Sequence, residues 1–238
     1  MAALIAFDTA TERMSIAVKG HDGRVWSHDG EGGARASAAL LPGILGLLEQ
    51  AGLALADLDA IAFGRGPGAF TGLRTACSVA QGLAFGAGKP VLPIDSLLAV
   101  AEEARAGAPA CRVWAVMDAR MAQIYAAEYE HADGRWRSVV APLLTDCEAL
   151  ALRWQTQPPQ RVAGDALHAC AMRLPTFGAA LAPEARPGAV ALLALAEVAW
   201  AAGAAVDPAE ALPLYVRDKV AQTTFERDAA RLQRAERV

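Results

Sequence analysis

The chain has 238 residues and a formal net charge of −4 at pH 7, with 54% hydrophobic and 20% charged residues. This composition is typical of a globular protein with room for two α/β-sized domains, and it excludes an intrinsically disordered chain. The negative net charge offers no general attraction for nucleic acid, so we do not expect this chain to bind RNA on its own.

The first half of the sequence alternates short apolar runs with amphipathic stretches, which predicts an α/β domain. We expect strands at residues 4–7, 14–18, 25–26, 60–63 and 91–94, and helices at 37–51, 71–85 and 97–106. Pro42 is expected to interrupt the first helix. The break at residues 107–109 is the predicted domain boundary and gives domains at 1–106 and 110–238.

The second half begins as the first does. An apolar run at 113–117 ends in Asp118, as the run at 4–7 ends in Asp8, and a turn and a second strand follow each aspartate. This recurrence predicts a duplicated fold.

Further along the chain we expect strands at 136–140 and 162–163 and an alanine-rich core helix within 188–206. Thr145 with Glu148 forms a predicted capping box for a helix to about residue 154, and a short helix is expected through 172. A last helix is expected from Thr223. The tail at 207–238 either packs back on the first domain or extends, and the sequence leaves both arrangements open.

The stretch GRGPGAFTGLR at 64–74 joins a predicted strand to a predicted helix. Gly66 and Gly68 allow a tight turn, and Thr71 is expected to cap the helix. Free amide groups at a helix N-terminus favour an anion, so this turn is a candidate phosphate loop. The alternative is a tight turn with no ligand, and the glycine spacing matches neither a Walker A loop nor a dinucleotide fingerprint.

Small residues recur every four positions along the helix that follows. The strip consists of Gly72, Ala76, Ala80 and Ala84. Such a strip lets another helix approach closely, either inside the subunit or across a subunit contact.

Asp8 and Asp118 each end an apolar strand, where a carboxylate can hold hydrated Mg²⁺ or orient a nucleotide phosphate. The alternative role for either aspartate is to cap a turn. The complete set of candidate nucleotide or phosphate-loop residues is Asp8, Thr9, Thr11, Gly66, Gly68, Thr71, Asp118, Arg120, Gly164 and Asp165. The histidines show no metal-binding spacing, and there is no Gly-x-Ser-x-Gly elbow, so the sequence specifies neither a metal centre nor a catalytic residue.

The four cysteines contain no Cys-x-x-Cys pair, which predicts reduced, mostly buried thiols in a cytoplasmic protein. We expect neither a signal peptide nor a membrane-spanning segment.

Four segments resemble the bacterial TsaB family in identity, order and spacing. They are IAFDTATERMSIAV, GRGPGAFTGLRTACSVAQGLAFG, VMDARMAQIYAAEY and LPLYVRDKV. The resemblance implies an actin-like ATPase (ASKHA) fold, with two related α/β domains that each contain a mixed sheet flanked by helices. It also implies a dimerization subunit of the complex that makes threonylcarbamoyladenosine in tRNA.

The family resemblance implies partners as well. It indicates a heterodimer with the paralogous transferase of the TsaD family, docking of an ATPase of the TsaE family, a homodimer when the chain is alone, and contact with tRNA only through the complex. The transferase moves a threonylcarbamoyl group onto the adenosine beside the anticodon of ANN-decoding tRNAs. The implied interface residues are Leu41, Ile44, Leu45, Leu48, Gly72, Leu73, Ala76, Ala80 and Ala84.

The paralogue carries a paired-histidine metal motif in the region that matches residues 30–42, and this chain has no histidine there. We therefore expect an accessory subunit and not an enzyme. No certain cofactor is implied, and ATP or ADP with Mg²⁺ at the complex is a candidate. The alternative function is an independent actin-fold ATPase or phosphotransferase.

Overall fold

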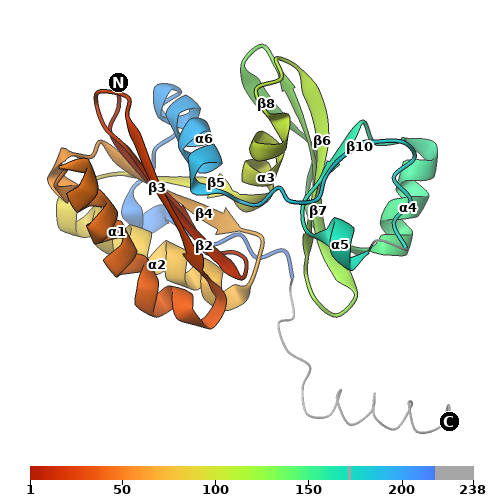
Figure 1. The fold of residues 1–238 in the computed structure, drawn as a ribbon, viewed down its shortest axis with the longest axis horizontal. Helices are drawn as coiled ribbons and strands as arrows, with labels where there is room; N and C mark the ends of the chain where they lie inside the picture. Colours follow the sequence, from red (N-terminus) through yellow and green to blue (C-terminus); the bar gives the residue numbers. More distant parts are fainter. Residues whose placement is uncertain (171–172, 218–238) are drawn as a thin grey trace, which may run out of the picture.

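The computed structural model describes residues 1–170 and 173–217, which form two α/β units side by side (Figure 1). The first unit contains a five-stranded sheet of β1 (Leu4–Asp8), β2 (Arg13–Lys19), β3 (Val25–Glu31), β4 (Ala60–Gly66) and β5 (Val91–Asp95). The second contains a five-stranded sheet of β6 (Cys111–Asp118), β7 (Gln123–Ala132), β8 (Arg135–Asp146), β9 (Arg161–Ala163) and β10 (Ala180–Ala182).

Six helices accompany the sheets in the described residues: α1 (Ala36–Ala51), α2 (Phe70–Ala87), α3 (Ser96–Arg105), α4 (Cys147–Thr156), α5 (Ala166–Ala169) and α6 (Ala189–Ala201). Short 3-10 turns lie at η1 (Gly33–Arg35), η2 (Leu55–Asp57) and η3 (Pro208–Glu210). The predicted last helix from Thr223 lies outside the described residues.

The two sheets have the same topology. Their strand orders are β3-β2-β1-β4-β5 and β8-β7-β6-β9-β10, and β1 and β6 are both central, with an antiparallel neighbour on one side and a parallel neighbour on the other. The predicted duplication is therefore confirmed, and the fold is the two-domain α/β arrangement of mixed sheets flanked by helices that the sequence predicted.

Successive residues of a β-strand point to opposite faces of the sheet, so each central strand contributes side chains to two core layers. Ile5 and Phe7 face α1 and α2, whereas Leu4 and Ala6 face α6. The second sheet repeats this arrangement between α3 on one face and α4 with α5 on the other. Each fully buried aliphatic or aromatic side chain contributes roughly 1.5–3 kcal/mol, so both strand faces must stay covered.

The chain crosses between the units more often than the predicted boundary implies. The expected break at 107–109 lies between α3 and β6, but α6 packs back on the first sheet, and η3 packs on α2. An isolated antiparallel β-bridge also pairs Val206 with Val91, the first residue of β5 in the first sheet. Residues 189–211 thus accompany the first sheet, whereas the sequence assigned 189–206 to the second domain.

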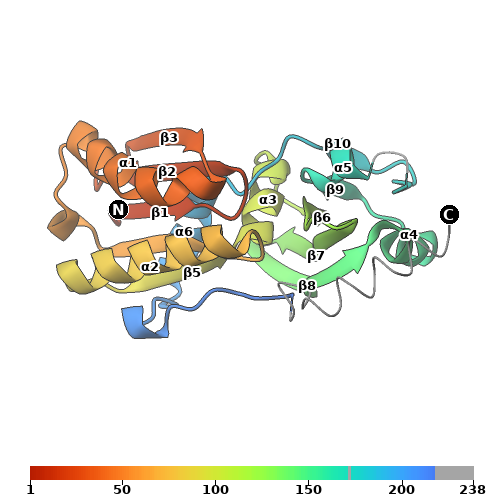
Figure 2. The ribbon, with the colours of Figure 1, turned by 90° about the horizontal axis from the view of Figure 1, so that it is seen from below.

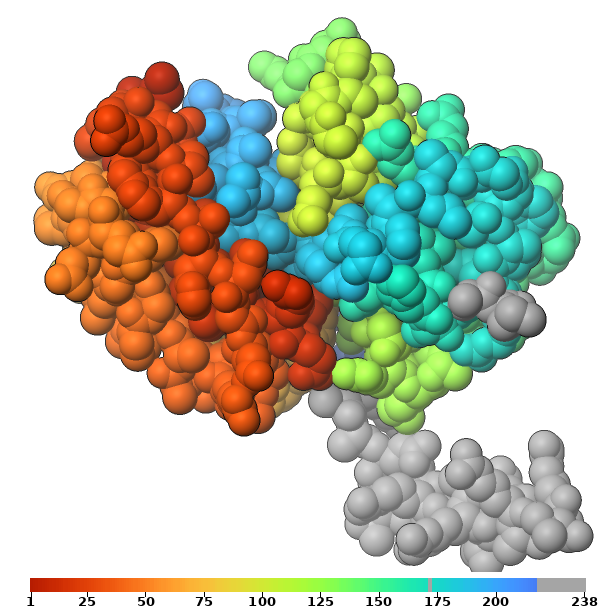
Figure 3. Space-filling model, viewed as in Figure 1, coloured from red at the N-terminus to blue at the C-terminus, as the bar shows by residue number. Residues whose placement is uncertain are grey.

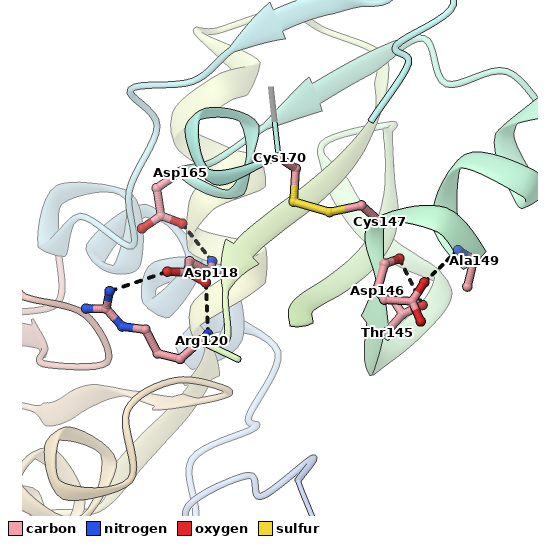
Figure 4. Close-up of a disulfide and its surroundings, with 8 residues drawn as sticks. All are labelled: Asp118, Arg120, Thr145, Asp146, Cys147, Ala149, Asp165 and Cys170. Carbon is pink, nitrogen blue, oxygen red and sulfur yellow. Dashed lines mark hydrogen bonds and ion pairs between the residues drawn. A yellow bond between two sulfur atoms is a disulfide. The ribbon is translucent and has the colours of Figure 1, made fainter. Parts of the chain in front are cut away.

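Several local predictions were wrong. Helix α1 continues through Pro42, because this residue lies on the exposed side and its missing N–H leaves only a solvent-facing carbonyl. Thr71 lies inside the first turn of α2 and caps nothing. The N-cap of α4 is Asp146, whose Oδ1 accepts a hydrogen bond from the amide of Ala149 at 2.7 Å, in place of Thr145 (Figure 4).

The expectation of four free thiols was also wrong. Cys147 and Cys170 form a disulfide that joins the start of α4 to the end of α5 (Figure 4). Cys77 and Cys111 are free. The cysteine pattern therefore gives no evidence that the protein lies in a reducing compartment.

Candidate functional site

A cleft of about 450 Å³ lies between the two units. Its first-unit wall comes from residues 10–12 and the start of α2, and its second-unit wall comes from residues 117–121 and Asp165. Residues 214–217 form a third side. Figure 3 shows the seam along which the red and orange atoms of the first unit meet the green and cyan atoms of the second.

Asp8 lies behind this cleft and does not line it. Its side chain is buried, and its two carboxylate oxygens accept hydrogen bonds of 2.6 Å from the amide of Ala10 and from Ser96 Oγ. Burial raises the pKa of Asp8 to about 6, although these two hydrogen bonds act in the opposite direction. Gly64 leaves room for this carboxylate, because a Cβ at position 64 would lie 1.7 Å from Asp8 Oδ2.

The glycine turn is filled by the chain's own backbone. The amide of Ala69 donates a hydrogen bond of 2.8 Å to the carbonyl oxygen of Ala10, and a Cβ at Gly68 would lie 2.5 Å from the same oxygen. Thr9 is buried, and its hydroxyl donates to the carbonyl oxygen of Gly72. These glycines serve close packing against residues 8–12, which is the ligand-free alternative that the sequence left open.

The remaining glycines of the candidate set also face protein. The amide of Gly66 donates to Ser96 Oγ, and a Cβ there would meet Leu73. A Cβ at Gly164 would lie 2.0 Å from the carbonyl oxygen of Val116. Thr11 does line the cleft, but its hydroxyl forms a local turn with the backbone of Arg13.

The second-unit wall brings together three of the predicted residues (Figure 4). Asp118 accepts a hydrogen bond of 2.8 Å from the amide of Arg120, and Asp165 accepts one of 2.9 Å from the amide of Asp118. The Arg120 guanidinium reaches across the cleft to Glu12, with 2.9 Å between Nη2 and Oε1. Arg120, Met121 and Ala122 all have positive φ, a rare run for residues other than glycine.

A magnesium nucleotide does not fit this arrangement. Both oxygens of Asp8 already accept protein hydrogen bonds, and the turn before α2 is occupied by Ala10. The cleft wall presents the carboxylates of Glu12, Asp118 and Asp165 together with Arg120 and Arg217, and Arg120 pairs with both Glu12 and Asp118. Within residues 1–170 and 173–217, no group of three His, Cys, Asp or Glu side chains is placed to hold a metal ion.

The predicted interface residues divide into two groups. Only Leu41 and Leu45 are exposed, at 41% and 52%. The buried ones are Ile44, Leu48, Gly72, Leu73, Ala76, Ala80 and Ala84. The small strip on α2 packs inside the first unit, which is one of the two arrangements that the sequence left open, and a contact with another subunit through Leu41 and Leu45 stays a prediction.

The predicted interface included Leu41 and Leu45 on the outward face of α1 but no residue on the outward face of α2. On α2 it consists of Thr75, Ser78, Gly82, Phe85 and Gly86, with Phe85 61% exposed. No atom lies within 4 Å of a Cβ built at Gly82 or Gly86. With Leu41 and Leu45 on the adjacent α1, these residues form what we call the α1–α2 face, and Figure 2 shows the two helices side by side.

The sequence contained a signal for the inward orientation of the small strip. Leu73 and Cys77 lie on one side of the small strip and Val79 lies on the other, so the strip is at the centre of the apolar arc, whereas Arg74 and Ser78 mark the opposite side. The centre of such an arc normally packs on the core.

Comparisons with known proteins identify relatives over most of the chain. Residues 33–223 match the family model of TsaD, described as tRNA N6-adenosine threonylcarbamoyltransferase. The tRNA threonylcarbamoyladenosine biosynthesis protein TsaB of Haemophilus influenzae is 34% identical over 227 residues, which cover 91% of this chain and 94% of that protein. The TsaB protein of Escherichia coli is 40% identical over 134 residues, covering 56% of this chain and 58% of that protein.

The solved structure of YeaZ from Pseudomonas aeruginosa superimposes with a TM-score of 0.82 at 40% identity, covering 90% of this chain and 100% of that chain. The Haemophilus influenzae protein and the Pseudomonas aeruginosa structure each match at least 90% of this chain. The chain therefore belongs to the TsaB family.

Proposed function

We propose that this chain is a non-catalytic subunit that binds and activates the TsaD-family transferase in the threonylcarbamoyladenosine modification of ANN-decoding tRNAs. Membership of the TsaB family and the match to the TsaD model support a role in this pathway. The observation that carries the partner role is the α1–α2 face, where leucine and phenylalanine side chains stand exposed among small residues.

The α1–α2 face suits a paralogous helix pair. Two glycines without neighbouring atoms allow a partner helix to approach closely, and the exposed apolar side chains would become buried. We propose that the transferase presents its equivalent helices to this face, forming a four-helix contact. In the absence of the transferase, the same face would join two copies of this chain as a homodimer.

The cleft supports an accessory role over the alternative of an independent ATPase or phosphotransferase. Asp8 is enclosed by Ala10 and Ser96, and the glycine turn is filled, so neither loop offers a place for a magnesium-bound phosphate. We propose that any ATP or ADP in the assembly is held by other subunits, including a docked TsaE-family ATPase.

Location follows from the proposed substrate. No helix in the described part of the chain is both long and apolar enough to cross a bilayer. We propose a cytoplasmic location, because that is where tRNA is modified, and we expect tRNA to contact the assembled complex.

The partner role can be tested by titrating the purified TsaD-family transferase with this chain. Leu45→Arg and Gly82→Arg place a charge on the α1–α2 face and are expected to weaken binding at least about a hundredfold, since an unpaired buried charge costs roughly 3 kcal/mol or more. Arginine at Ala76 or Ala80 is unsuitable, because those side chains are in the core.

Leu152→Arg is the matched control, since Leu152 is a 65% exposed leucine on α4 of the second unit. We expect this variant to bind as the unmodified chain does. Unchanged affinity in both face variants, or equal loss in Leu152→Arg, would refute the assignment of the α1–α2 face.

A further inference from the structure

The two units are held together differently on the two sides of the cleft. On one side, α3 packs on the second sheet and also contacts α6 of the first unit, and the side chains of Leu98 and Trp136 pack against the cores of both units. On the other side, the extended segment 212–217 passes from η3 toward the second unit (Figures 1 and 2). We call this segment the strap.

The strap is anchored to the first unit at the start of α2. The amide of Leu214 donates a hydrogen bond of 2.7 Å to the carbonyl oxygen of Arg65. The Tyr215 ring lies 5.2 Å from the Phe70 ring, and Tyr215 Oη accepts a hydrogen bond of 3.0 Å from Arg74 Nε. The Arg74 guanidinium also lies 3.8 Å above Phe70, so one aromatic and cationic cluster fixes this end.

The other end of the strap is anchored to the second unit. Arg217 Nη2 donates a hydrogen bond of 2.8 Å to the carbonyl oxygen of Ala119, and Val216 packs against the core of the second sheet. Ala119 directly precedes the three residues with positive φ, a backbone conformation that costs about 1–2 kcal/mol per residue. The hydrogen bond from Arg217 thus stabilises a turn whose backbone conformation is unfavourable by itself.

Few other contacts oppose opening on this side. The Glu12–Arg120 ion pair also spans the cleft, but both side chains are about 70% exposed, at 74% and 69%. Exposed pairs of this kind contribute roughly 0–1 kcal/mol. The strap is therefore the main described connection on the open side of the cleft.

We propose that the strap is a releasable latch that sets the opening of the cleft. With both ends anchored, the units are held closed; when either end is released, they rotate about the side packed by α3 and Trp136. A latch of this type acts in series, because the loss of either anchor frees the whole segment.

The proposal can be tested by single-molecule energy transfer between dyes on the two units. Ser37→Cys on α1 and Glu148→Cys on α4 are exposed labelling sites, in a background where Cys77→Ser and Cys111→Ser remove the free thiols. Tyr215→Ala removes the side-chain contacts of the first anchor with Phe70 and Arg74, and Arg217→Ala removes the hydrogen bond of the second anchor to Ala119. Leu212→Ala is the control, since this strap residue is 67% exposed.

We expect both anchor variants to shift the transfer efficiency and to broaden its distribution, with Leu212→Ala unchanged. Amides at residues 120–123 should exchange with solvent at least about tenfold faster in the anchor variants. Combining Tyr215→Ala with Arg217→Ala should add no further shift, because the two anchors act in series.

Two results would overturn the latch. One is an unchanged energy-transfer distribution in both anchor variants at an unaltered melting temperature. The other is an additive effect in the double variant, which would show that each residue only stabilises its own unit. Circular dichroism establishes that every variant is folded before the comparison is made.

Discussion

Gly72 and Thr9 are in direct backbone contact: a Cβ at position 72 would lie 1.9 Å from the Thr9 carbonyl oxygen, and Thr9 Oγ1 donates a hydrogen bond of 2.8 Å to the Gly72 carbonyl oxygen. This contact packs the first turn of α2 against the loop that follows β1. It explains why position 72, in the first turn of α2, is a glycine.

Gly72→Ala should lower the free energy of unfolding by about 3 kcal/mol or more, because backbone atoms cannot move aside as a flexible side chain can. Gly82→Ala is the control on the same helix. Its Cβ would meet no atom within 4 Å, and replacing an exposed helical glycine should stabilise the chain by about 0.5–1 kcal/mol. Urea titration of dilute protein measures both changes, and a Gly72→Ala variant as stable as Gly82→Ala would contradict the packing role.

Asp8 should make stability depend on pH. Its pKa is about 6 in the folded chain and 3.8 as the ordinary value, so the folded state holds the proton more tightly. The contribution of this group is fully present below pH 3.8 and is lost as pH rises through about 6. The difference between the two pKa values corresponds to about 3 kcal/mol.

Asp8→Asn should therefore gain stability relative to the unmodified chain between pH 4 and pH 7, since asparagine does not ionise. Denaturant titrations at several pH values measure the difference between the two proteins. If the two stability profiles run parallel across this range, the buried carboxyl does not titrate as described.

The chain alone should show no saturable binding of Mg-ATP at concentrations up to about 1 mM. This limit corresponds to a binding free energy weaker than roughly 4 kcal/mol in magnitude. The enclosed carboxylate of Asp8 and the filled turn before α2 are the reasons. Isothermal titration calorimetry measures this directly. Tight binding that disappears in Asp118→Asn would restore the ATPase alternative.

Much of the fold was predictable from sequence because its signals are local. The apolar runs that end in Asp8 and Asp118 marked the two central strands, and their recurrence indicated the duplication that the sheet orders confirm. The return of α6 to the first sheet was not predictable, because its alanine-rich sequence is apolar apart from Glu197 and does not specify which sheet it covers.

The site was harder to predict because its chemistry depends on tertiary neighbours. Aspartate after a buried strand can hold a metal ion or accept two protein hydrogen bonds, and only the position of Ser96 decides between these roles for Asp8. Tyr215 likewise reads as an ordinary aromatic in an extended segment until its packing on Phe70 is known.

We propose that this chain activates a transferase through the α1–α2 face and performs no transfer itself. The most direct test measures threonylcarbamoyl transfer to tRNA by the TsaD-family transferase with the remaining pathway components, adding either no further protein, the unmodified chain, Leu45→Arg or Leu152→Arg. We predict transfer with the unmodified chain and with Leu152→Arg, and at least about tenfold less with Leu45→Arg or without the chain. Transfer by this chain in the absence of the transferase, or full activity with Leu45→Arg, would contradict the account.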